Sequence, residues 1–315
     1  MLNPNTLLDS RLIINSLNLA TRLLLFYVLA ASCTQKAKQS DTYINDIRRN
    51  KSPFDLSRPS QTLNLEKKLA EISGLTHDDE DNLWCINDEK GNLYQLDNKG
   101  QVQAKIHFGK DGDYESLAHN NGLIYISKSN GTIKVADLQK KRKITEHNTG
   151  LDKQDNVEGL YYSKKDKALL IASKTKNSSG AVSIYGFDLK NKKIEAEPKF
   201  TINLIEALDS LVKSKVLPQS MKENKIRSRV KAFGPSGISQ DPISQKYYIT
   251  SSRGRLLTIL DDQGKVEYIH LLDEKIFRQP EGISFDSKGN LFISNEARGR
   301  VANVLIFERK QTEVR

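Results

Sequence analysis

Acidic residues recur at one position of a short repeated phrase, and their types suggest metal chemistry. Glu115, Glu158 and Glu281 each stand second in a copy of the phrase, and Asp88 and Glu296 each follow an asparagine at the end of a nearby apolar run. Carboxylate oxygens beside Asn and Ser oxygens, without sulfur or imidazole, are the ligands of a hard cation such as Ca²⁺. These five residues are therefore the candidate calcium ligands. The alternative is that each glutamate accepts hydrogen bonds from the amides of a neighbouring strand and binds no metal.

The signatures of common catalytic sites do not occur in the sequence. There is no Gly-x-Ser-x-Gly, no Walker loop and no His-Glu-x-x-His. The histidines fall at the expected ends of strands or in turns, and we expect them at the surface. They are His77, His107, His119, His147 and His270.

The elements that would position the acidic residues are short strands in a repeated order. The first phrase occupies residues 72–75, 114–117, 157–160, 235–238 and 280–283. The third residues of successive copies are 42, 43, 78 and 45 positions apart. An apolar run that ends in Asn or Ser closes 11 to 14 positions after each third residue, and a turn with glycine usually follows. Short strands, glycine turns and a period in the low forties are typical of the blades of a β-propeller.

The predicted fold is all-β, a single β-propeller of five blades, with six blades as the alternative. The first phrase would form the innermost strand, where a glycine lets neighbouring backbones approach the narrow axis. The second residues of the phrase would then converge at one mouth of the central channel. The gap of 78 positions contains apolar residues at helical spacing and no turn glycine before Gly234, which favours a helical insertion near 205–231 over a sixth blade.

Both ends of the propeller are expected to contribute to its last blade. Residues 62–69 alternate in polarity ahead of the first unit and could supply the missing outer strand, which would close the ring and remove an exposed sheet edge. We therefore expect a propeller over residues 62–310, a flexible polar tether over 34–61 and a tail over 311–315.

Cys33 stands in the setting of a bacterial lipoprotein signal. Arg22 precedes an apolar run over residues 23–31, and small residues come before the cysteine. The pattern resembles signals in which the cysteine is acylated, so residues 1–33 are predicted to be a signal segment and Cys33 the lipidation site. The alternative is an uncleaved anchor, for which the run is short because a spanning helix needs roughly 20 residues.

The net charge of +10 invites a nucleic-acid partner, but Lys and Arg are scattered along the sequence and no nucleic-acid motif appears. We expect no nucleic-acid binding. Positive charge also suits a protein near an anionic membrane or envelope polymer, but lysines that protect solvated strand edges are the simpler explanation.

The order of the phrases resembles the SdiA-regulated family of bacterial envelope proteins. The likeness rests on residues 71–75, 87–89, 113–117, 156–160, 235–238 and 279–283, and it extends over residues 62–308. It implies a five-bladed propeller behind an N-terminal membrane segment, with a bound calcium ion and no established activity. The family is similar at a distance to NHL-repeat propellers, some of which are hydrolases.

The sequence leaves three functions open. The first is a monomeric calcium-binding lipoprotein of the cell envelope that serves as a scaffold for an unidentified envelope ligand or protein. The second is a calcium-dependent hydrolase of an ester, lactone or phosphoester, in which the metal polarises the scissile group and Asp88, Glu296 or His119 activates water. The third is a structural propeller without metal, because the fold alone does not decide among them.

Overall fold

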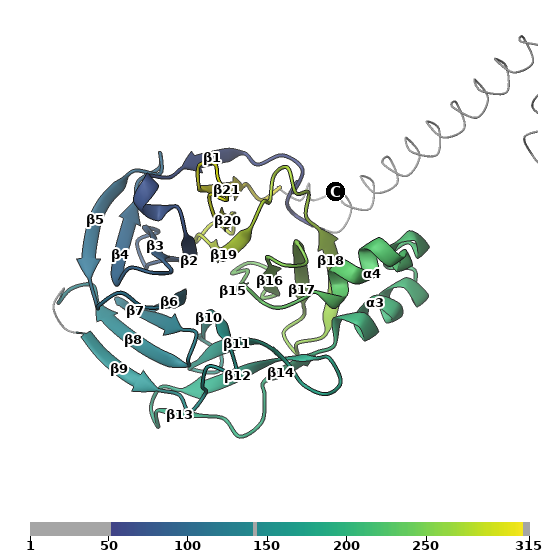
Figure 1. Ribbon diagram of the computed structural model, residues 1–315, viewed down its shortest axis with the longest axis horizontal. Coiled ribbons are helices and arrows are strands. Elements are labelled where there is room, and N and C mark those ends of the chain that lie inside the picture. The colour runs from purple at the N-terminus through teal and green to yellow at the C-terminus, as the bar shows by residue number, and fades with distance from the viewer. Residues whose placement is uncertain (1–51, 141–143, 311–315) are drawn as a thin grey trace, which may run out of the picture. The chain divides into compact units, whose positions relative to one another are not determined.

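The computed structural model describes residues 52–140 and 144–310, and within them the strands form five antiparallel sheets around a common axis (Figure 1). From the inner to the outer strand, blade 1 is β2 (Ile72–His77), β3 (Leu83–Asn87), β4 (Asn92–Leu96) and β5 (Val102–His107). Blade 2 is β6 (Tyr114–Asn120), β7 (Leu123–Lys128), β8 (Thr132–Asp137) and β9 (Ile144–Asn148). Blade 3 is β10 (Val157–Ser163), β11 (Ala168–Lys176) and β12 (Val182–Asp188), bordered by β13 (Lys193–Ile194) and β14 (Phe200–Ile202). Blade 4 is β15 (Gly237–Gln240), β16 (Tyr247–Ser251), β17 (Leu256–Leu260) and β18 (Val266–Leu271).

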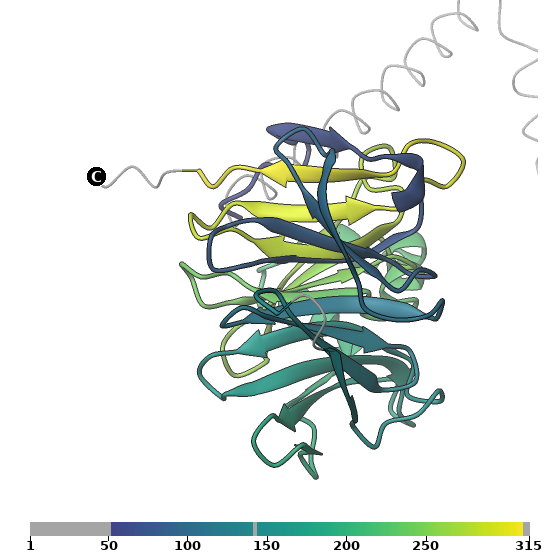
Figure 2. The same cartoon turned by 90° about the vertical axis from the view of Figure 1, so that its left-hand side faces the viewer.

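Blade 5 combines the two ends of the described chain. Its order is β19 (Pro280–Phe285), β20 (Leu291–Asn295), β21 (Asn303–Phe307) and β1 (Gln61–Asn64), with Thr62 opposite Leu305. The inner strands β2, β6, β10, β15 and β19 contact one another in a ring, and Figure 2 shows the twisted sheets from the side. The predicted five blades and the predicted closure are both confirmed.

The folded domain begins before the expected boundary at residue 62. Phe54 is buried between Tyr248 and Phe285, and the guanidinium of Arg309 lies over its ring. The amide of Lys310 also donates to the carbonyl of Pro53. Residues 53–60 therefore belong to the propeller and not to a tether. Strand β1 ends at Asn64, after which a short 3-10 helix, η1 (Lys67–Leu69), replaces the expected alternation.

Glycines of the inner strands lie where adjacent strands come closest. A Cβ on Gly237 would lie 2.7 Å from the carbonyl oxygen of Glu281, and one on Gly282 would lie 2.8 Å from the amide nitrogen of Leu75. Between the blades, buried apolar side chains such as those of Leu75, Cys85 and Val304 form the core. The recurring glycine of the first phrase is thus explained by the approach of neighbouring inner strands.

The insertion between blades 3 and 4 is helical, as predicted, but it is not one helix. It consists of α3 (Leu204–Lys213), the 3-10 helix η2 (Gln219–Lys222) and α4 (Asn224–Lys231), which lie beside β18 at the rim (Figure 1). Asn203 caps α3 by accepting from the amide of Glu206. Lys215, with a φ of 60°, and Pro218 end the first helical segment. Asp209 on α3 pairs with Arg227 on α4 at 2.7 Å.

Each helix within residues 52–140 and 144–310 is too short or too polar to cross a lipid bilayer. Cys33, the predicted lipidation site, lies outside the described residues. Cys85, which the sequence places in a buried strand, is a fully buried free thiol on β3.

Candidate functional site

Five acidic side chains form what we call the acidic mouth: Asp88, Glu115, Glu158, Glu281 and Glu296. The three glutamates at the second place of the phrase lie near the first residues of inner strands β6, β10 and β19, and the other two follow the last residues of β3 and β20. Because the start of each inner strand faces the end of its neighbour in an antiparallel sheet, all five lie toward one face of the propeller.

The five carboxyl groups interact electrostatically in a chain. Asp88 is coupled to Glu296, Glu296 to Glu281, Glu281 to Glu158, and Glu158 to Glu115. The structure therefore places all five residues that the sequence selected toward the same face of the propeller. Asn87 and Asn295, the expected companions, have other partners: Asn87 accepts from the amides of Glu89 and Lys90, and Asn295 donates to the carbonyl of Ile276.

Burial raises the pKa of every carboxyl group in the acidic mouth, and repulsion by another member adds to this at Asp88, Glu115 and Glu281. Burial followed by the charge of Glu158 raises the pKa of Glu115 to about 9, and burial followed by Glu296 raises the pKa of Glu281 to about 8. Burial, with Glu71 and Glu296 nearby, raises the pKa of Asp88 to about 7. The pKa values of Glu158 and Glu296 are also raised, chiefly by burial.

Lys174 is a cation among these carboxyl groups, and the sequence did not single it out. Its Nζ lies 2.8 Å from Oε1 of Glu158, and both side chains are nearly buried. Its charge also lowers the pKa values of Glu115, Glu281 and Glu296. Gly234 makes room for the stem of this lysine, because a Cβ there would lie 2.6 Å from Cγ of Lys174.

The donors of the acidic mouth suit a hard cation, although they are not drawn together around one point. Oδ1 of Asp88 is buried without a hydrogen-bond partner among the described residues, and carboxylate oxygens are what Ca²⁺ takes. Within residues 52–140 and 144–310, no three Asp, Glu, His or Cys side chains are placed to hold a single ion. Oε1 of Glu281 accepts from the side-chain amide of Gln279 at 2.8 Å.

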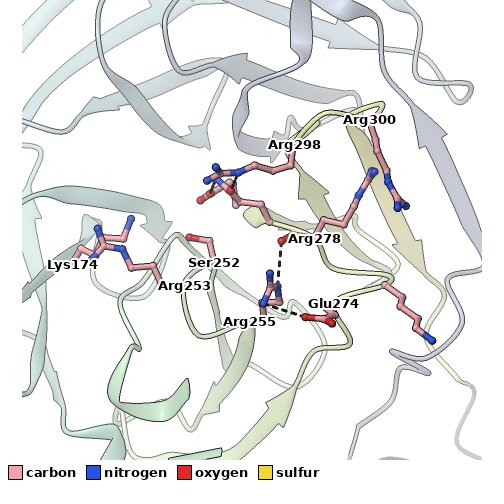
Figure 3. Close-up of a pocket in the computed structure, with 11 residues that line it drawn as sticks. Lys174, Ser252, Arg253, Arg255, Glu274, Arg278, Arg298 and Arg300 are labelled. Atoms are coloured by element: carbon pink, nitrogen blue, oxygen red, sulfur yellow. Dashed lines mark hydrogen bonds and ion pairs between the residues drawn. The ribbon is translucent and has the colours of Figure 1, made fainter. Parts of the chain in front are cut away.

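A basic pocket of about 830 Å³ adjoins the acidic mouth and shares Lys174 and Glu281 with it (Figure 3). Besides Ser252, Glu274 and Gln279, seven cationic side chains line it: Lys174, Arg253, Arg255, Lys275, Arg278, Arg298 and Arg300. They come from the end of β11 and from the β16–β17, β18–β19 and β20–β21 connections. The fold therefore gathers seven of the 49 Lys and Arg of the chain at one pocket.

A signal for this pocket was present in the sequence. Lys174, Arg253 and Arg298 follow the last residue of the second phrase by one, two and three positions in three different blades. Because the end of the second strand faces the start of the first, such residues lie at the same face as the acidic mouth.

The other end of the channel holds a smaller cavity of about 260 Å³. There Nδ1 of His77 lies 2.8 Å from Oγ of Ser284, and burial lowers the pKa of His77 to about 4. His119 accepts from the amide of Gly122, and burial lowers its pKa too. The expectation that all histidines are at the surface is wrong for His270, which is 4% exposed, whereas His77 is partly exposed and lines this cavity. His119 lies at the opposite end from the acidic mouth and cannot act there.

Comparison with known proteins supports the family and the fold. The sequence model described as SdiA-regulated matches residues 58–298. No curated protein matches the chain. The crystal structure of glutaminyl cyclase from Myxococcus xanthus aligns with a TM-score of 0.53 at 10% identity, over 80% of this chain and 95% of that one. A protein of unknown function from Bacteroides thetaiotaomicron aligns with a TM-score of 0.48 at 13% identity, over 76% of this chain and 56% of that one. A chain of the nidogen/laminin complex aligns with a TM-score of 0.45 at 14% identity, over 74% of this chain and 79% of that one.

At these identities the structural likeness concerns the fold alone. The family match is different, because it spans more than half of the chain and includes all five residues of the acidic mouth. The chain belongs to the SdiA-regulated family.

Proposed function

We propose that this chain is a calcium-binding scaffold of the cell envelope, which binds a ligand or partner at the face that holds the acidic mouth. The observation that carries the proposal is the convergence of five carboxyl groups from four blades around one channel mouth, with raised pKa values. When all five groups ionise, Lys174 beside Glu158 and Arg298 beside Glu296 balance only part of their charge, and a divalent cation would balance the rest.

The residues that would hold the ion are members of the acidic mouth. Oδ1 of Asp88 has no hydrogen-bond partner among the described residues and is therefore available as a ligand atom for the ion. Binding requires glutamate side chains to turn toward a shared point and Nζ of Lys174 to leave Glu158. Both side chains are long and have several rotatable bonds, so the backbone of the propeller can stay in place. Ca²⁺ suits this arrangement better than Mg²⁺, because its coordination geometry is more flexible.

Thermal unfolding of metal-stripped protein tests the calcium site. An ion that binds only the native state stabilises it by about 2.7 kcal/mol at one hundred times Kd, which raises the melting temperature by several degrees. We expect this rise with Ca²⁺, a smaller one with Mg²⁺ and none in a Glu158→Gln/Glu281→Gln variant. The matched control is Glu197→Gln/Glu308→Gln, which removes two exposed carboxylates and should keep the response. Identical melting of the wild type in Ca²⁺ and in chelator would overturn the proposal.

The envelope location rests on the sequence around Cys33 and has its own test. Lipidation predicts that cells fed a labelled fatty acid incorporate the label into the wild type and not into Cys33→Ala. Cys85→Ala is the control, because that thiol is buried in β3 and should not affect labelling. Equal labelling of the wild type and Cys33→Ala would contradict a lipid anchor at this residue.

A further inference from the structure

The basic pocket has a large excess of positive charge. Seven cationic and two acidic side chains line it, and two further acids beside it, Glu158 and Glu296, pair with Lys174 and Arg298, which leaves a net charge of +3 when all four acids are ionised. Cations that are only solvated at the surface repel one another and gain nothing from being assembled. Such a concentration is a reason to look for an anionic ligand.

Part of the charge is not used within the protein. Arg255 lies 3.6 Å from Glu274, Arg298 lies 3.5 Å from Glu296, and Arg278 donates to the carbonyl of Val301. In the part of the chain that the structure describes, the side chains of Arg253 and Arg300 form no hydrogen bond or ion pair, although the charge of Arg253 helps to lower the pKa of Glu158. These guanidinium groups are available to a ligand, and Figure 3 places them on opposite sides of the pocket.

The helical insertion holds the arginine-bearing loops in position. Arg229 on α4 donates to the carbonyls of Gly254 at 2.8 Å, Arg255 at 2.5 Å and Leu272 at 3.0 Å. One side chain therefore joins the β16–β17 connection to the start of the β18–β19 connection. Such support is what a preorganised binding site needs, because it lowers the cost of ordering the loops around a ligand.

Two of the arginines stand in backbone conformations that L-residues rarely adopt. The φ angles are 46° at Arg255 and 41° at Arg298, in the left-handed region that favours glycine. A side chain at such a position costs stability, and residues of this kind gather at functional sites. The long cationic side chains at both positions project into the same pocket.

The lining defines the class of ligand. The pocket volume falls within the range of sites for small molecules, and no aromatic side chain lines it among the described residues. It therefore has no platform on which an aromatic base or ring could stack. Guanidinium groups bind phosphate through two parallel hydrogen bonds, and their number here matches a ligand with several negative charges. We infer that the basic pocket binds a small, non-aromatic ligand that carries two or more phosphate groups.

Titration calorimetry with glucose 1,6-bisphosphate on the purified full-length protein, at physiological ionic strength, tests the assignment. We expect Arg253→Ala/Arg300→Ala to weaken binding by at least about tenfold, a change of about 1.4 kcal/mol. Arg253→Lys, which keeps the charge and loses the planar fork, should give an intermediate loss. The charge-matched control is Lys99→Ala/Lys105→Ala, two exposed residues of blade 1 away from the pocket, and it should bind within about twofold of the wild type.

Three further outcomes decide the class. Absence of binding by the wild type, or equal losses in the pocket and control variants, would overturn the site. Citrate binding as tight as the bisphosphate would overturn the choice of phosphate. Arginine-dependent binding to vesicles with phosphatidic acid, without binding of the free bisphosphate, would assign the pocket to a lipid headgroup instead. Circular dichroism melting of each variant separates lost binding from lost folding.

Discussion

Ionisation of the acidic mouth works against the folded state. Its carboxyl groups have raised pKa values in the native protein, about 9 for Glu115 and about 8 for Glu281, whereas a carboxyl group in an unfolded chain titrates near 4. Between these values the native state binds more protons than the unfolded state. The free energy of unfolding therefore falls as pH rises, by up to about 1.4 kcal/mol per pH unit for each such group.

His77 has the opposite effect at lower pH. Burial lowers its pKa to about 4, so the stability that comes from its neutral form is lost as pH falls from about 6.5 toward 4. Below pH 6.5 the two effects on the free energy of unfolding oppose each other. Above pH 6.5 His77 no longer offsets the effect of the acidic mouth. We therefore expect metal-free protein to lose stability steadily from pH 6.5 to 9.

Urea unfolding at several pH values measures this slope. Glu281→Gln should flatten it, because the substitution removes one of the titrating groups, and should make the protein relatively more stable at pH 9. Glu308→Gln, an exposed control, should leave the slope unchanged. A wild-type stability that rises from pH 6.5 to 9 would contradict the electrostatic description of the mouth.

At the scale of elements, strands and ring closure were predictable because they follow from local patterns. The glycine in the first phrase marks positions such as Gly237 and Gly282, where a Cβ would collide with the next inner strand. The alternation over residues 62–69 predicted the closing strand, because an open edge on β21 would be unfavourable, although only Gln61–Asn64 forms β1. The helical spacing near 205–216 correctly predicted the buried side chains of Leu208, Leu211 and Val212.

The basic pocket was not predictable in the same way, because it depends on loop conformations. Lys174, Arg253 and Arg298 stand at different distances after their strands, so no fixed spacing links them. The loop of Arg253 is positioned partly by Arg229, which belongs to an insertion outside the repeat. The break of that insertion into α3 and α4 was also missed, although Pro218 lies between them. It is this break that places α4 beside the β16–β17 connection.

At the scale of the whole molecule, Lys174 connects two sites of opposite charge. Its Nζ pairs with Glu158 in the acidic mouth, and its side chain also lines the basic pocket. A Ca²⁺ ion bound to the carboxylates of the acidic mouth would displace Nζ of Lys174 from Glu158, and the lysine could then turn toward the basic pocket. The pocket would then gain a positive charge that is otherwise compensated by Glu158. If both proposed sites exist, each ligand should strengthen the binding of the other, because a coupling free energy is reciprocal.

Titration of glucose 1,6-bisphosphate with and without saturating Ca²⁺ measures this coupling in the wild type. We expect Ca²⁺ to lower the Kd of the bisphosphate at least about fivefold, at the lower end of typical couplings between sites. Lys174→Met should bind the bisphosphate more weakly and should show a smaller calcium effect, because only the direct attraction between the two bound ions remains. Gly234→Ala, which crowds the lysine stem without removing its charge, should also reduce the effect. Unchanged bisphosphate affinity in Ca²⁺, in a protein that binds each ligand alone, would show that the two sites act independently and that Lys174 stays with Glu158.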